Sequence, residues 1–143
     1  MINKESLQYA MSFLGTPYKW GGANPISGVD CSGFVQEVLT SCGIDIQGDQ
    51  NAQAYYNHFS IHGALNVFGA GALAFYGKDE KSITHITLFI NDWQTIGANG
   101  GGSHVIDKTF ADKNDAFVKI RPFDYRKDLV AVYMPIYGEK GSS

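Results

Sequence analysis

One cysteine of the chain stands where its thiol could react. Cys31 follows Asp30 in the segment GVDCSGFVQEVL, residues 28–39, where an amphipathic pattern begins. Backbone N–H groups in the first turn of a helix lack partners within the helix, and together with the helix dipole they favour a thiolate over a thiol. We therefore expect a lowered pKa and a nucleophilic sulfur at Cys31. The alternative is a buried cysteine that acts as a small apolar residue, an interpretation that suits Cys42 better.

A thiol nucleophile needs a base, and the chain has four histidines. His85 lies near the start of THITLFIN, which is typical of a central strand. Side chains alternate between the two faces of a strand, so His85 points away from the face of Ile86 and needs a polar partner. It is the candidate base, although a structural histidine satisfied by its neighbours is the alternative. His58 and His62 are expected at the surface, and His104 follows a run of glycines in a loop.

Periodicity and turn residues predict the elements that position this pair. A helix is expected from the cap Asn3 to the stop Gly15, a second from Cys31 to Cys42, and a weaker one over 49–59. Five short segments rich in β-branched and aromatic residues predict strands at 72–77, 84–91, 93–98, 116–123 and 129–136. Their short connections favour an antiparallel sheet, and helices followed by strands predict an α+β domain. We expect one domain over residues 1–137 and a flexible tail at 138–143.

Cysteine spacing and composition exclude several classes of protein. Eleven residues of helix would separate the two cysteines by about 16 Å, too far for a disulfide. The net charge of −3 and the absence of roughly 18 consecutive apolar residues argue against a nucleic-acid partner and a membrane span. His58 and His62 lack the glutamate of a zinc-binding His-Glu-x-x-His motif, so neither a metal nor a cofactor is expected.

The segment PYKWGGANPISGVDCSGFVQEVL, residues 17–39, resembles the signature of the NlpC-type cell-wall peptidases. THITLFI resembles the second motif of this family, in which a histidine opens a strand. The resemblance covers roughly residues 5–135 and implies a small papain-like fold. It also implies hydrolysis of peptide stems in bacterial peptidoglycan, commonly between γ-D-glutamyl and diaminopimelate or lysine. By position, it implies Cys31 as the nucleophile, His85 as the base, and Tyr18, Asp30 and Ser32 as residues that line the substrate site.

The chain departs from the family pattern at two positions. The polar residue that orients the histidine is expected at Gly97, which has no side chain. Asn99 shares that strand face and is the predicted substitute, with a bulge in GANGGG closing a gap of about 7 Å along the strand. His104 is the alternative third catalytic residue. Ala72 replaces an aspartate of the family and leaves that structural role unfilled.

These observations favour a cysteine endopeptidase that cleaves peptidoglycan stem peptides through a thiol acyl-enzyme. An amidase or acyltransferase on the same scaffold is one alternative, and a non-catalytic wall-binding or structural module is the other. The start of the chain lacks the basic-then-apolar order of a signal peptide. We therefore expect a domain that is either excised from a longer protein or delivered by another one. It would be cytoplasmic when made and act on the wall after delivery, with a bacteriophage tail or lysis assembly as a natural carrier.

Overall fold

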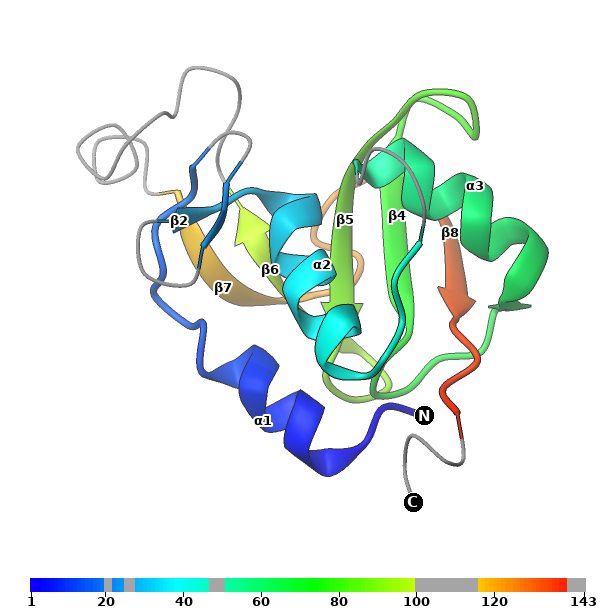
Figure 1. The fold of residues 1–143 in the computed structure, drawn as a ribbon. Coiled ribbons are helices and arrows are strands. Elements are labelled where there is room, and N and C mark those ends of the chain that lie inside the picture. The colour runs from blue at the N-terminus through cyan, green and yellow to red at the C-terminus, as the bar shows by residue number, and fades with distance from the viewer. Residues whose placement is uncertain (20–21, 25–27, 47–50, 100–115, 139–143) are drawn as a thin grey trace.

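The computed structural model describes residues 1–19, 22–24, 28–46, 51–99 and 116–138. Within these residues, three helices precede all six strands of the main sheet (Figure 1). The helices are α1 (Lys4–Met11), α2 (Cys31–Ser41) and α3 (Ala52–His62). The strands of the sheet are β3 (Ala64–Leu65), β4 (Leu73–Gly77), β5 (Ile83–Phe89), β6 (Gln94–Asn99), β7 (Phe117–Pro122) and β8 (Leu129–Met134).

The sheet is antiparallel throughout, with the strand order β3-β8-β4-β5-β6-β7. The predicted α+β fold is confirmed, and all five predicted strands are present. The additional strand β3 has two residues, too few for an alternating pattern. A two-stranded ribbon of β1 (Ala23–Asn24) and β2 (Gly28–Val29) lies in the segment predicted as a loop.

The helix boundaries follow their capping residues. Asn3 and Asn51 cap α1 and α3 by accepting hydrogen bonds from backbone N–H groups three residues on. The first helix ends at Met11, before the predicted stop, and α3 begins and ends later than predicted. His58 and His62 therefore belong to α3, where their rings lie 4.6 Å apart. The two cysteines are free and lie at opposite ends of α2, as predicted.

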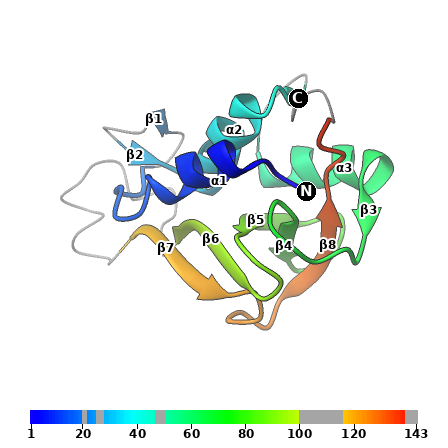
Figure 2. The same ribbon diagram turned by 90° about the horizontal axis from the view of Figure 1, so that it is seen from below.

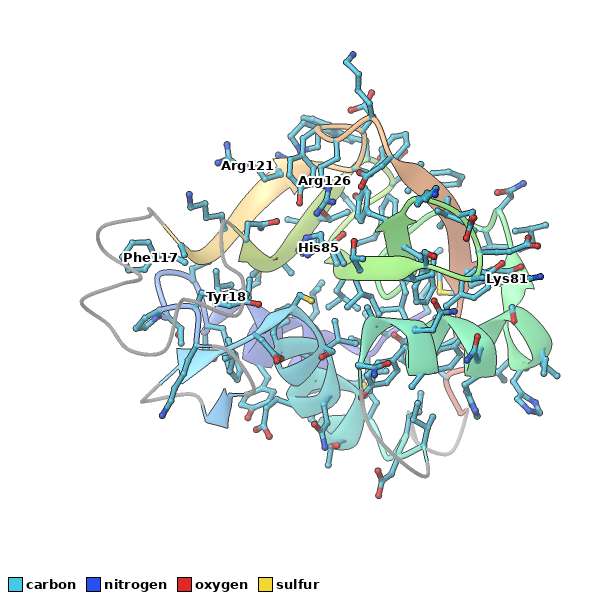
Figure 3. All side chains as sticks on the ribbon, turned by 90° about the horizontal axis from the view of Figure 1, so that it is seen from above. Tyr18, Lys81, His85, Phe117, Arg121 and Arg126 are labelled. Carbon is cyan, nitrogen blue, oxygen red and sulfur yellow. The ribbon has the colours of Figure 1, made fainter. Side chains whose placement is uncertain are left out.

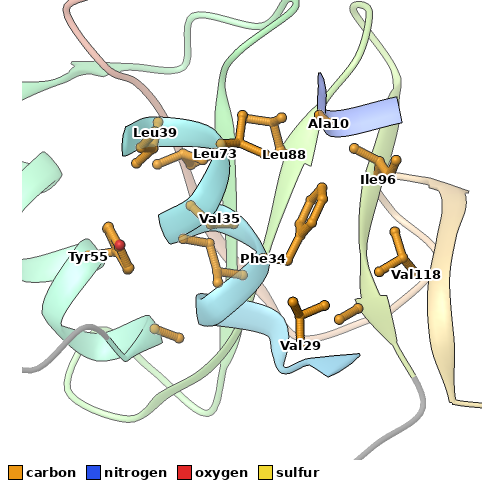
Figure 4. Packing of buried hydrophobic residues seen from close by; sticks show 14 of the residues in the cluster. Ala10, Val29, Phe34, Val35, Leu39, Tyr55, Leu73, Leu88, Ile96 and Val118 are labelled. Carbon is orange, nitrogen blue, oxygen red and sulfur yellow. The ribbon is translucent and has the colours of Figure 1, made fainter. Parts of the chain in front are cut away.

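The main hydrophobic core lies between the helices and one face of the sheet (Figure 2). Phe34 and Val35 of α2 pack toward Leu88 and Ile96 of the central strands (Figure 4). Each such side chain, when fully buried, stabilises the fold by about 1.5–3 kcal/mol. Because α2 is the most apolar of the three helices and lies over β5 and β6, this core fixes its first turn relative to β5.

A second, smaller core lies on the opposite face of the sheet. It is formed by Ala72, Ala74, Tyr76, Phe89, Val132 and Met134. The connection between β7 and β8 covers this face, and Phe123 and Tyr125 from that connection pack against the cluster (Figure 2). Ala72 is fully buried there, so the position that holds an aspartate in the family pattern is filled by apolar packing.

Among the described residues, no helix combines the length and apolar character needed to cross a bilayer. Of the predicted tail, only Gly138 is described.

Candidate active site

The first turn of α2 is held in place by its capping residue and by the loop before it. Asp30 accepts hydrogen bonds from the Gly33 backbone N–H at 2.6 Å and the Ser32 hydroxyl at 3.3 Å. The Asp30 backbone N–H donates to the Gly22 carbonyl at 2.9 Å. A Cβ at Gly33 would lie 2.0 Å from that same carbonyl oxygen, so only glycine lets the loop rest on the helix. This close approach fixes the first turn of α2, and with it Cys31, against the loop.

Cys31 is half-buried, and its sulfur is faced by the backbone N–H groups of Ile86, Ser32 and Cys31 itself. Burial raises the pKa of the Cys31 thiol to about 11, and the nearby Asp30 carboxylate acts in the same direction. The three N–H groups lower it by less. The expectation of a lowered pKa was therefore wrong, because loss of hydration outweighs the helix terminus at this position.

His85 lies on β5, and the pairing of β5 with β6 determines what faces it. Leu88 pairs with Ile96, and the same register continued along the strands places His85 opposite Asn99. Nε2 of His85 lies 3.0 Å from Oδ1 of Asn99, so the predicted hydrogen bond is present. His104, the alternative partner, lies outside the described residues.

The bulge that was expected to bring Asn99 within reach is not needed. The pairing of β6 with β7 runs without a shift from Gln94 to Asn99, and Gly97 lies across from Thr87 rather than His85. A Cβ at Gly97 would lie 2.7 Å from Cγ2 of Thr87. The glycine thus lets the two strands approach closely, and the orienting residue lies directly opposite the histidine.

A third residue, Tyr125, joins this pair from the connection between β7 and β8. Its hydroxyl lies 3.0 Å from Nε2 of His85 and donates a hydrogen bond to Oδ1 of Asn99. Sequence reasoning missed Tyr125 because it lies in a polar segment between two strands. The only local signal was an aromatic residue within that segment.

The His85 side chain is 7% exposed, and this burial lowers its pKa to about 4. The positive charge of Arg126 acts in the same direction, whereas the hydrogen bond to Oδ1 of Asn99 opposes it. Arg126 lies over the Tyr76 ring, with its Cζ 5.3 Å from the ring centroid, and forms an ion pair with Asp128. At neutral pH the imidazole is therefore uncharged and able to accept a proton. At neutral pH both the Cys31 thiol and the His85 imidazole are therefore uncharged.

Tyr18 lies in the loop that precedes α2, and its backbone N–H donates to the Ala116 carbonyl at 2.9 Å. Figure 3 shows His85 between Tyr18 on one side and Arg126 on the other. The Tyr18 side chain is 5% exposed, and its burial, together with Cys31 and Asp30, raises its pKa well above the usual value. The phenol therefore stays protonated and can donate a hydrogen bond beside Cys31.

The structure thus brings Cys31, Tyr18 and the start of β5 together. It also places the Asn99 side chain within hydrogen-bonding distance of His85. The Ser32 hydroxyl donates a hydrogen bond to Asp30, which caps α2, and the contact of either residue with substrate stays a prediction. Among the described residues, no three or more His, Cys, Asp or Glu side chains are grouped so that they could hold a metal ion.

Helices packed on an antiparallel sheet, with a cysteine at a helix start against the strand that carries a histidine, define a papain-like fold. The chain belongs to the NlpC/P60 family, whose model matches residues 15–120. The crystal structure of the NlpC/p60 domain of the peptidoglycan hydrolase SagA is 26% identical, with a TM-score of 0.63 over 92% of this chain and 98% of that one. An NlpC/P60 family protein from Bacillus cereus, at 22% identity, shares the fold with a TM-score of 0.68 over 93% of this chain and 39% of that one.

Two curated relatives from Bacillus subtilis are also similar in sequence. The bifunctional muramidase/DL-endopeptidase CwlT is 33% identical over 113 residues, which cover 74% of this chain and 31% of CwlT. A gamma-D-glutamyl-L-lysine dipeptidyl-peptidase is 28% identical over 131 residues, which cover 90% of this chain and 40% of the relative. The chain therefore spans about a third to two fifths of the length of these relatives.

Proposed function

We propose that the chain is a peptidoglycan hydrolase: a cysteine endopeptidase that cleaves stem peptides, at the bond between γ-D-glutamyl and diaminopimelate or lysine. The observation that carries this proposal is the oriented histidine. His85 is held through Nε2 by Asn99, and the thiol of Cys31 lies against the backbone of the next residue, Ile86. Relatives described as a DL-endopeptidase and as a gamma-D-glutamyl-L-lysine dipeptidyl-peptidase support this choice of bond.

The protonation states define the first step. Because the pKa of Cys31 is raised to about 11 and that of His85 is lowered to about 4, the pair does not rest as an ion pair. The thiol proton moves to Nδ1 of His85 as the sulfur attacks the carbonyl carbon of the substrate. The Cys31 backbone N–H and the protonated Tyr18 hydroxyl then donate to the oxyanion.

The second half of the reaction uses the same groups in reverse. The tetrahedral intermediate collapses as the C–N bond breaks, and imidazolium His85 gives its proton to the leaving amine. His85, neutral again, takes a proton from water as that water attacks the thioester. The C–S bond breaks, the proton on His85 returns to the Cys31 sulfur, and the carboxylic acid product leaves and loses its remaining proton to solvent.

The test is incubation with defined muropeptides and identification of the products by mass spectrometry. We expect two fragments separated at the γ-D-glutamyl bond, and no turnover by Cys31→Ala. Cys42→Ala is the matched control, because it removes the other free thiol from the far end of α2. Cleavage elsewhere or transfer to an added amine would indicate an amidase or acyltransferase. Binding to the muropeptides without products would indicate a wall-binding module, and turnover by Cys31→Ala would refute the mechanism.

The route by which the domain reaches the wall is a separate proposal. Its matches in longer relatives support its use as one module of larger chains. Synthesis in the cytoplasm followed by delivery in a bacteriophage tail or lysis assembly stays a prediction. Detection of the chain by mass spectrometry in purified virions would support it.

A further inference from the structure

The hydroxyl of Tyr125 lies in a closed triangle of hydrogen bonds with the base and its orienting amide. It lies 3.0 Å from Nε2 of His85, and Nε2 in turn lies 3.0 Å from Oδ1 of Asn99. The third side is the hydrogen bond that the hydroxyl donates to Oδ1. With three polar atoms this close together, only a few assignments of donor and acceptor satisfy all three hydrogen bonds.

The strand backbone fixes that arrangement. Nδ2 of Asn99 donates to the Gly97 carbonyl at 2.8 Å, and a carbonyl can only accept. The amide is therefore oriented with Oδ1 toward His85, and Oδ1 is itself only an acceptor. The Tyr125 hydrogen points to Oδ1, and the phenol oxygen accepts a hydrogen bond from the Arg126 side chain. A phenol oxygen has two lone pairs, so one remains to accept from Nε2–H. Both neighbours thus require a hydrogen on Nε2, and Nδ1 keeps its lone pair.

The turn that carries Tyr125 is tied to the sheet at several points. The Tyr125 backbone N–H donates to the Pro122 carbonyl at 3.1 Å, and its ring packs edge-on against Tyr76 with the ring centroids 5.7 Å apart. The Tyr76 hydroxyl donates to the Phe123 carbonyl at 2.6 Å. Tyr76 also lies beside the His85 ring, at a centroid distance of 5.5 Å. The hydroxyl is thus held against the imidazole by its own hydrogen bonds and by its ring packing.

We propose that Tyr125 is a positioning residue whose hydroxyl, given its direction by Asn99, holds His85 in the Nε2–H tautomer. The kinetic part of this inference rests on the proposed peptidase function, but the tautomer itself does not. A phenol hydroxyl can donate a hydrogen bond as well as accept one, so the Tyr125 hydroxyl can also donate to Nε2 of His85. When Asn99 is removed, the Tyr125 hydrogen loses its acceptor and turns to Nε2. His85 then carries its proton on Nδ1, where it cannot accept one from the thiol. Tyr125 therefore keeps Nδ1 of His85 free to accept a proton when Asn99 is present, and it favours a hydrogen on Nδ1 when Asn99 is absent.

Three variants test this reversal: Tyr125→Phe, Asn99→Ala and the double variant. We expect Tyr125→Phe to lower kcat by about 2- to 10-fold, the value of one ordinary hydrogen bond, with little change in KM. Asn99→Ala should lower kcat further, and adding Tyr125→Phe to it should recover several-fold of that loss. Tyr9→Phe is the matched control, since it deletes a hydroxyl bonded to Glu37 on the far side of α2. If Asn99→Ala does not fold, Asn99→Leu preserves the side-chain volume and serves the same comparison.

The tautomer is read without substrate by ¹⁵N NMR of the His85 ring at neutral pH. The wild type and Tyr9→Phe should show hydrogen on Nε2 and none on Nδ1. Asn99→Ala should move the signal toward Nδ1–H, and the double variant should show a mixture of the two forms. A double variant that is no more active than Asn99→Ala, or a ring in Asn99→Ala that keeps its hydrogen on Nε2, would overturn the proposal. The NMR measurement needs no substrate turnover. It therefore tests the tautomer of His85 even if the protein proves not to be a peptidase.

Discussion

The buried, uncharged state of His85 should make the stability of the fold depend on pH. In the unfolded chain the histidine has an ordinary pKa near 6.5, whereas burial and then Arg126 lower it to about 4 in the folded protein. Between these values the unfolded state binds more protons than the folded state, so the free energy of unfolding rises with pH and falls as the solution is acidified. At roughly 1.4 kcal/mol per pH unit, the full contribution is about 3 kcal/mol, and most of it is lost by about pH 4.5.

Replacement of His85 by Gln removes the titration and keeps a neutral polar side chain on the strand. Urea unfolding at pH 7 and at pH 4.5 gives the loss of stability on acidification for each variant. We expect the wild type to lose about 2–3 kcal/mol more than His85→Gln does. His58→Gln is the control, because His58 is only half-buried and its lowered pKa comes from partial burial and from His62. If the wild type and His85→Gln lose the same stability, His85 is not held neutral by the fold.

Two further predictions concern the surroundings of His85. Gly97→Ala should lower the free energy of unfolding by about 1–3 kcal/mol in denaturant titrations, because its Cβ would meet Cγ2 of Thr87 at 2.7 Å. Thr87→Ser, which lacks Cγ2, should restore part of that loss, and its failure to do so would place the strain elsewhere. Arg126→Met should raise the pKa of His85 and move the acid limb of kcat/KM to higher pH, whereas Lys127→Met in the same turn should not. An unchanged acid limb in Arg126→Met would show that burial alone sets the pKa.

The sequence was sufficient for the parts of the site that depend on local patterns. The amphipathic pattern that begins after Asp30 marks the start of α2, so the position of Cys31 in its first turn follows from its neighbours. The close approach of the loop to Gly33 was not predicted. The alternation along β5 placed His85 on the face away from the main core. Asn99 was predicted because it shares a strand face with Gly97, although the geometry invoked for it was wrong. Register between strands is a property of pairing, which the sequence of one strand does not contain.

The remaining features depend on contacts between segments that are distant in sequence. Tyr125 reaches His85 only because the β7–β8 connection folds over the face of the sheet that carries His85, and nothing within that connection indicates this. The raised pKa of Cys31 was missed for a related reason. A helix start is visible in the sequence, but the loss of water around the sulfur results from β5 packing against it.

The position of β8 within the sheet bears on the order in which the candidate site is assembled during synthesis. In the six-stranded sheet, β8 lies between the two strands that come first in the sequence, and it is hydrogen-bonded to β3 on one side and to β4 on the other. A nascent chain that has left the ribosome only as far as Asn99 contains both members of the proposed Cys31–His85 pair. It still lacks Tyr125, and one edge of β4 has no partner. Such non-local pairing forms slowly, and an unpaired edge attracts other strands. The site is therefore completed only after β8 has been synthesised, and a chain truncated before β8 would be prone to aggregate.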